Sequence, residues 1–124
     1  DYLENALINH LFRNDELASP TTVYCALYTS APSDAGGGTE VNTTGSYSRQ
    51  SITFGPPLTG STGNTNTLTF GPASTNWGTI VAFGIFDAST SGNLLVWNTL
   101  NSPVVINNTD SLQFQSASLQ VTIA

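Results

Sequence analysis

Residues 77–87 read WGTIVAFGIFD, which is the most hydrophobic stretch of this 124-residue sequence. Apolar side chains fall on both of its alternating faces, which is typical of a strand that is covered on both sides of its sheet. Thr79, Val81, Phe83 and Ile85 form one predicted face, and Ile80, Ala82, Gly84 and Phe86 form the other. We therefore expect this strand to lie in the middle of a sheet.

A second stretch, residues 22–29, reads TVYCALYT and has the same period of two. Its odd-numbered face carries Val23, Cys25 and Leu27, and its even-numbered face carries two tyrosines and an alanine. This pattern predicts another central strand. Cys25 is the single cysteine, so no disulfide can form within the chain, and its apolar neighbours indicate a small buried side chain.

Six further short strands are predicted on either side of these two. Their residue ranges are 51–54, 68–70, 94–100, 104–106, 112–114 and 119–123. Gly-Pro follows the first two of these ranges. Proline cannot donate a hydrogen bond to a neighbouring strand, so each strand is expected to end there, and both ends are expected at one rim of a sheet. Residues 57–65 look like a turn, and residues 89–93 look like a hairpin turn in which Gly92 suits positive φ. The whole pattern predicts an all-β fold: an antiparallel β-sandwich, jelly-roll-like, of about eight short strands with one N-terminal α-helix.

The predicted helix occupies residues 1–13, where apolar and half-apolar side chains recur at three- and four-residue spacing. This stripe consists of Leu3, Ala6, Leu7, His10 and Leu11. Asp1 and Glu4 fit a capping box at its start. A helix of this length is marginal alone in water, so the stripe must be covered either by its own sandwich or by another chain.

Residues 30–46 are predicted to form a long loop with little to anchor it to a core. The segment contains Pro32, Asp34 and three consecutive glycines. Loops of this length in small domains are usually functional or mobile. The length of the chain fits a single domain over residues 1–124, with the helix at 1–13 and the β-sandwich at 22–124.

The composition excludes two classes of partner. Only 8% of the residues are charged, there is no lysine, and the net charge is -6. Binding to nucleic acid or to anionic lipid depends on basic side chains, and Arg13 and Arg49 are the only ones. We therefore expect no nucleic-acid partner and no membrane partner. The sequence also shows no signal peptide and no apolar stretch of membrane length, and since it begins at Asp1 without Met, residues are expected to precede it.

No catalytic, cofactor or metal site is predicted. His10 is the single histidine and Cys25 is distant from it, so a zinc site and a serine–histidine triad both lack members. Four acidic residues could in principle meet around calcium, but no Asp-x-Asp-x-Asp run gathers them, and they are expected in turns. These are Asp34, Glu40, Asp87 and Asp110.

Arg49 is the only basic residue of the predicted β-region. It is expected to pair with a carboxylate, either within the domain or across a subunit boundary, where a guanidinium can bind two oxygens at once. Trp77 and Trp97 could form a platform for stacking sugars, although aromatic residues in short strands are more often core or subunit interface.

Short motifs over most of the chain support a more specific interpretation. They include DYLEN at 1–5, VYCALYTS at 23–30, GTEV at 38–41, RQ at 49–50, TFG at 53–55, WGT at 77–79, GIFDA at 84–88 and GNLL at 92–95. With these motifs the chain resembles a family of small virion structural proteins of tailed bacteriophages, often labelled tail or tail-fibre proteins and in some phages serving as capsid cement or decoration proteins.

The resemblance implies a non-enzymatic virion component that is assembled in the host cytoplasm. The first interpretation is a capsid decoration or cement protein, a homo-oligomer and most simply a homotrimer, bound to the major capsid protein. The alternative is a tail or tail-fibre component that contacts host surface glycan, and a small esterase or glycosidase is a third. Partner contacts are predicted on the helix and the long loop, at Leu3, Leu7, His10, Leu11, Asp34, Glu40 and Arg49.

Overall fold

The computed structural model describes residues 1–123, which form one α-helix, one short 3-10 helix and nine β-strands. The helices are α1 (Tyr2–Phe12) and η1 (Thr43–Gly45). The strands are β1 (Val23–Ser30), β2 (Thr39–Glu40), β3 (Gln50–Ile52), β4 (Ser61–Gly63), β5 (Leu68–Phe70), β6 (Gly78–Phe86), β7 (Leu94–Ile106), β8 (Leu112–Phe114) and β9 (Gln120–Thr122).

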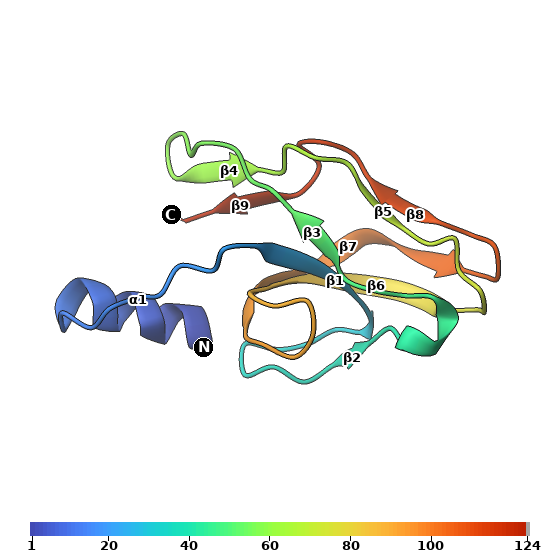
Figure 1. Cartoon of the computed structure of the whole chain (residues 1–124), viewed down its shortest axis with the longest axis horizontal. Coiled ribbons are helices and arrows are strands. Elements are labelled where there is room, and N and C mark those ends of the chain that lie inside the picture. The colour runs from blue at the N-terminus through green and yellow to red at the C-terminus, as the bar shows by residue number, and fades with distance from the viewer. Residues whose placement is uncertain (124) are drawn as a thin grey trace.

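The strands form two layers (Figure 1). The first is a five-stranded antiparallel sheet with the order β2-β1-β6-β7, in which β3 also pairs with β1. The second consists of two antiparallel ribbons, β4 with β9 and β5 with β8. The prediction of an all-β, sandwich-like fold with an N-terminal helix is confirmed, with a second layer made of two ribbons instead of one continuous sheet.

The two stretches that the sequence marked as central strands are central. β6 lies between β1 and β7, and β1 lies between β6 on one side and β2 with β3 on the other. The alternation predicted for β1 is also confirmed. Cys25 and Leu27 face the main core between the layers, while Ala26 and Tyr28 face a smaller apolar cluster on the outer side of the sheet.

The main core is built from both layers. Its fully buried side chains include Leu27, Ile52, Leu68, Phe70, Ile80 and Ile106, which come from β1, β3, β5, β6 and β7. Burying such a side chain contributes about 1.5–3 kcal/mol. These contacts hold the two ribbons on the sheet, together with backbone hydrogen bonds between the segments that follow β3 and β4.

The strand alternation predicted for β6 is wrong in its first half, since Val81 and Ala82 both face the outer cluster at the point where the pairing with β7 is irregular. Ile80 pairs with Val104 and Ala82 pairs with Thr99, so β7 advances five residues while β6 advances two. Ile80 consequently joins the main core together with Phe83, and Ala82 joins the outer cluster. The bulge also explains why two short strands were predicted, at 94–100 and 104–106, where the structure has the single strand β7.

Residues 30–46 are more firmly anchored than the sequence suggested. Val41 is buried, and its amide donates to the carbonyl of Leu27 at 3.0 Å. The indole nitrogen of Trp77 donates to the carbonyl of Gly45 at 2.8 Å. The prediction of a loop with little to anchor it is therefore wrong from β2 onward, and residues 33–38 form the largely exposed part, after the buried Pro32.

The two Gly-Pro strands do not share a sheet. β3 belongs to the five-stranded sheet, whereas β5 belongs to a ribbon of the other layer. The predicted common rim is therefore wrong. Residues 57–65 were predicted to be a turn, but they include β4, whose three residues Ser61–Gly63 are too short and too polar to show a strand pattern.

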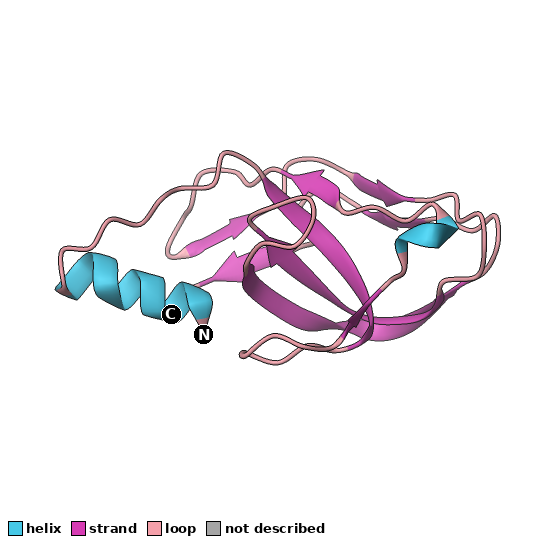
Figure 2. Cartoon of the chain, turned by 60° about the horizontal axis from the view of Figure 1, so that its bottom comes forward, coloured by secondary structure: helices cyan, strands magenta, loops and turns pink. Residues whose placement is uncertain are grey.

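The helix α1 has the predicted position and lies at one end of the sandwich, where it packs on β7 (Figures 1 and 2). None of its residues is buried. Half of the capping box is present: Glu4 Oε2 lies 2.8 Å from the backbone nitrogen of Asp1, and this contact lowers the pKa of Glu4. The Asp1 side chain makes no capping hydrogen bond, so the other half of that prediction is wrong.

The first prediction concerns Cys25, whose side chain is fully buried in β1. Burial raises the pKa of its thiol to about 12, so the reactive thiolate is absent near neutral pH. We expect a disulfide reagent at pH 8 to leave the native protein unmodified and to modify one thiol per chain in denaturant. Stoichiometric labelling of the native protein, measured by intact mass, would contradict this placement of β1.

Candidate functional site

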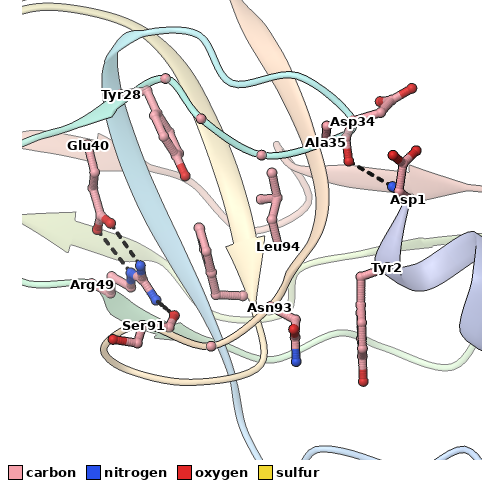
Figure 3. Close-up of a pocket in the computed structure, with 15 residues that line it drawn as sticks. Asp1, Tyr2, Tyr28, Asp34, Ala35, Glu40, Arg49, Ser91, Asn93 and Leu94 are labelled. Carbon is pink, nitrogen blue, oxygen red and sulfur yellow. Dashed lines mark hydrogen bonds and ion pairs between the residues drawn. The ribbon is translucent and has the colours of Figure 1, made fainter.

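Three of the predicted contact residues line one cleft, shown in Figure 3. They are Asp34, Glu40 and Arg49, and the cleft measures about 540 Å³. The glycine-rich segment 34–38, Tyr28 of β1 and the hairpin turn at 91–94 complete its walls. Segments far apart in the sequence therefore meet here, because the loop after β1 and the hairpin between β6 and β7 lie on the same side of the sheet.

Arg49 is the most extensively bonded side chain of this cleft. It binds both carboxylate oxygens of Glu40, at 2.8 and 2.9 Å, and donates to the carbonyl oxygens of Ala88 and Ser91 at 2.9 and 2.8 Å. Its guanidinium carbon lies 3.7 Å from the centroid of the Phe86 ring. Of the two alternatives left by the sequence, the structure shows the pair within the chain.

The environment of Arg49 keeps it charged. Burial is the largest single effect and would lower its pKa, but the hydrogen bonds to Glu40 together with the charge of Glu40 and of the neighbouring tyrosines outweigh burial and raise the pKa. Only 8% of the Arg49 side chain is exposed, against 26% for Glu40. A nearly buried cation of this kind is stable only with its partners in place.

Tyr47 connects the ion pair to the central strand. Its hydroxyl donates to Glu40 Oε2 at 2.7 Å and accepts the backbone N–H of Leu27 at 3.0 Å. The ring is 4% exposed and packs edge-on against Trp77, with 5.6 Å between centroids. Burial raises the pKa of this phenol, so the hydroxyl keeps the proton that it donates.

The bonds of Arg49 to Glu40, Ala88 and Ser91 therefore stabilise the fold, and we call this set of contacts the Arg49 clamp. Arg49 joins the long loop, through Glu40, to the hairpin turn, through Ala88 and Ser91. Both oxygens of Glu40 are already bonded within the chain, so a contact between Glu40 and a basic residue of a partner would have to compete with Arg49. The exposed Asp34 carboxylate is free of that constraint.

The other predicted contact residues lie on α1, away from the Arg49 pair. Leu3 and Leu7 are half-buried, and His10 is exposed, with Nδ1 donating to the carbonyl of Asp15 at 3.0 Å. Leu11 is 67% exposed. The structure thus divides the predicted stripe into a packed part and an exposed part.

Sequence reasoning missed two apolar residues of this helix. Ile8 and Phe12 are 52% and 80% exposed, and with Leu11 they follow a three- and four-residue spacing on a face that adjoins the predicted stripe at Leu11. We call Ile8, Leu11 and Phe12 the helix outer face. The sequence did carry a signal for them, because Ile8 and Phe12 are apolar and four residues apart, but only the stripe of Leu3, Leu7 and Leu11 was used in the prediction.

Several chemical possibilities can be compared with the structure. Trp77 is 8% exposed and belongs to the main core, which confirms the interpretation favoured for aromatic residues of short strands and leaves this ring no surface on which a sugar could stack. Asp87 accepts hydrogen bonds from the backbone and side chain of Asn93, as expected of a turn residue. In the described part of the chain, no three His, Cys, Asp or Glu side chains group closely enough to hold a metal ion. Over residues 1–123, neither helix has the length and apolar character needed to cross a membrane.

The second prediction compares the two arginines of the chain. Arg49→Ala removes a nearly buried cation and leaves Glu40 without its partner, so we expect the free energy of unfolding to fall by about 3 kcal/mol. Arg13→Ala removes an exposed cation whose side chain donates one hydrogen bond, to the side-chain oxygen of Asn9 at 3.3 Å, and we expect a change within about 0.5 kcal/mol. Urea unfolding measures both. Equal effects of the two substitutions would show that the Arg49 clamp does not stabilise the fold.

Comparison with protein families matches residues 1–122 to the family described as podophage GP4 fiber I protein gp80. Comparison with curated proteins finds no match. The family match covers both layers of the sandwich, the Arg49 clamp and α1, and it confirms the resemblance to phage structural proteins drawn from the short motifs. The chain therefore belongs to the family of podophage GP4 fiber I protein gp80 and is a structural component of a phage virion.

Proposed function

We propose that this protein is a non-enzymatic building block of a phage tail fibre, where it acts by assembling with other copies and with neighbouring virion proteins. The observation that carries the proposal is the match of residues 1–122 to a fiber protein family. A protein of a fiber acts through its contacts with other chains, so assembly is the property that we assign to this fold.

The fibre interpretation is better supported than capsid decoration, which was the first expectation from the sequence. The family description names a fiber and no capsid component. The short motifs are compatible with either location, because they specify the fold and not the site of attachment. A tail or tail-fibre protein is accordingly the preferred partner, ahead of the major capsid protein.

The helix outer face is the proposed contact between copies. No residue of α1 is buried, and the apolar side chains of Ile8, Leu11 and Phe12 are more than half exposed. An eleven-residue helix is marginal in water without a packing partner, and its contact with β7 leaves these three side chains exposed. Covering the helix outer face with a second copy would remove this apolar surface from water.

The non-enzymatic part of the proposal is supported by the chemistry of the candidate nucleophile and base. Cys25 is buried with its pKa raised to about 12. His10 is exposed at the end of α1, and its ring nitrogen is bonded to a backbone carbonyl instead of a serine or cysteine. General acid–base and nucleophilic catalysis both require such groups to be paired in a cleft.

The third prediction tests self-association through the helix outer face. The doubly substituted variant Ile8→Ser, Phe12→Ser should dissociate into monomers, because its helix no longer offers an apolar surface. Sedimentation velocity should show the unmodified protein as an oligomer, with about three times the 13.0 kDa chain mass for the trimer, and the variant as a monomer.

Leu58→Ser is the matched control, since Leu58 is 77% exposed and lies outside the helix. Removing residues 1–13 should also give a monomer, with a cooperative thermal transition that shows the β-sandwich is still folded. A monomeric unmodified protein, or equal dissociation by Leu58→Ser, would contradict the assignment. Outright unfolding of the truncated chain would place α1 in the stabilising core of the sandwich.

The fourth prediction tests location in the virion. Antibody fragments against this protein should label the tail of intact particles in electron micrographs and leave the capsid shell unlabelled. Quantitative mass spectrometry should give far fewer copies than the major capsid protein. Labelling distributed over the shell, with a copy number comparable to that of the major capsid protein, would restore the decoration interpretation.

A further inference from the structure

A second cleft lies where β7 bulges away from β6. It measures about 400 Å³ and is bounded by residues 98–102 of the bulge, by Phe83 of β6, by Phe114 of β8 and by residues 118–120 before and within β9. We call it the bulge cleft. Bulges are common beside functional sites because they reposition side chains, and this one displaces three extra residues of β7 from the sheet.

Aromatic rings form the floor of the bulge cleft. The rings of Phe83 and Phe114 are half-buried and lie 6.2 Å apart between centroids, inclined at 56°. Phe114 is held from behind by Phe70, edge-on at 6.1 Å, and Phe70 is fully buried. The floor is therefore rigid and partly open to solvent before any ligand arrives.

Neutral polar side chains form the rim. Asn101, Ser102 and Gln120 are exposed, and their side chains make no hydrogen bond within residues 1–123. The side-chain oxygen of Asn98 accepts the backbone N–H of Thr99 at 2.8 Å, which leaves its amide hydrogens for another acceptor. All the residues that line this cleft are uncharged.

The two clefts differ in what they offer a ligand. In the first cleft Arg49 and Glu40 are bonded to each other, whereas the bulge cleft presents free amides and a hydroxyl above aromatic carbon. Sugars have matching chemistry, since their C–H faces pack on aromatic rings and their hydroxyls exchange hydrogen bonds with amides. A net charge of -6 disfavours anionic sugars.

We propose that the bulge cleft binds a neutral saccharide, which rests on the proposed role in a tail fibre and makes the host surface glycan its source. A strand from another chain is a poorer occupant. Pro103 interrupts the row of donors along β7, and the N–H of Thr99 is already bonded to Asn98, so this edge cannot continue a regular ladder.

The test is a titration of the full chain, labelled with nitrogen-15, followed by amide chemical shifts. The probes are glucose, galactose, N-acetylglucosamine and rhamnose, with glucuronic acid as the anionic comparison. We expect at least one neutral sugar to produce saturable shifts confined to residues 98–102, 114 and 118–120, with a dissociation constant in the millimolar range. Glucuronic acid should leave these amides unchanged.

Matched variants locate the binding. Asn101→Ala and Gln120→Ala each remove one hydrogen-bonding group and should weaken binding about fivefold, while Asn108→Ala, an exposed asparagine outside the cleft, should leave it unchanged. Ser102→Trp should fill the cleft and abolish binding, with the dispersion of the spectrum showing that the variant is folded.

Three outcomes would overturn the proposal: no saturable shift with any neutral sugar, shifts elsewhere on the molecule, or shifts in residues 98–102 that depend on protein concentration without sugar. The last would make the bulge cleft an interface between copies. Tail labelling of the virion is measured independently of sugar binding, so a negative titration together with a labelled tail rejects the saccharide site alone. Absence of tail labelling rejects the fibre role.

Discussion

The hydrogen bonds of Leu27 are the constraint on which much of the structure depends. Leu27 lies in the middle of β1, between the part of the strand that pairs with β3 and the part that pairs with β2. Its carbonyl accepts from Val41 and its N–H donates to the hydroxyl of Tyr47. A fully buried backbone amide left unbonded would be costly, so the chain after β1 has to return to this point.

The return of the chain brings the clamp with it. Tyr47 reaches Leu27 only if its hydroxyl proton has an acceptor, which is Glu40, and Glu40 is in turn bound by Arg49. Arg49 then bonds the hairpin between β6 and β7. A continuous series of hydrogen bonds thus runs from the central strand to the hairpin. Because only 8% of the residues are charged, the pair of Arg49 with Glu40 is a rare instance of charged side chains within this fold.

Stability and proposed function use different parts of the molecule. The clamp and the main core consist of buried groups that have their partners within the chain. The helix outer face consists of exposed apolar side chains, and the rim of the bulge cleft consists of exposed polar side chains above an aromatic floor, without partners for these groups in the described part of the chain. A fibre component needs both kinds of surface, because it must attach to its neighbours at one place and remain accessible at another.

The sequence alone determined the all-β fold, the two central strands, the position of α1 and the pairing of Arg49 with a carboxylate, because each follows from local periodicity or from the scarcity of charge. It did not determine the anchored loop, the ribbon strand β4, the bulge of β7 or the exposure of Ile8 and Phe12. These depend on contacts between distant segments, such as Trp77 with Gly45 and Ile80 with Val104. Periodicity shows which residues share a face, but only the tertiary structure decides whether another segment covers that face.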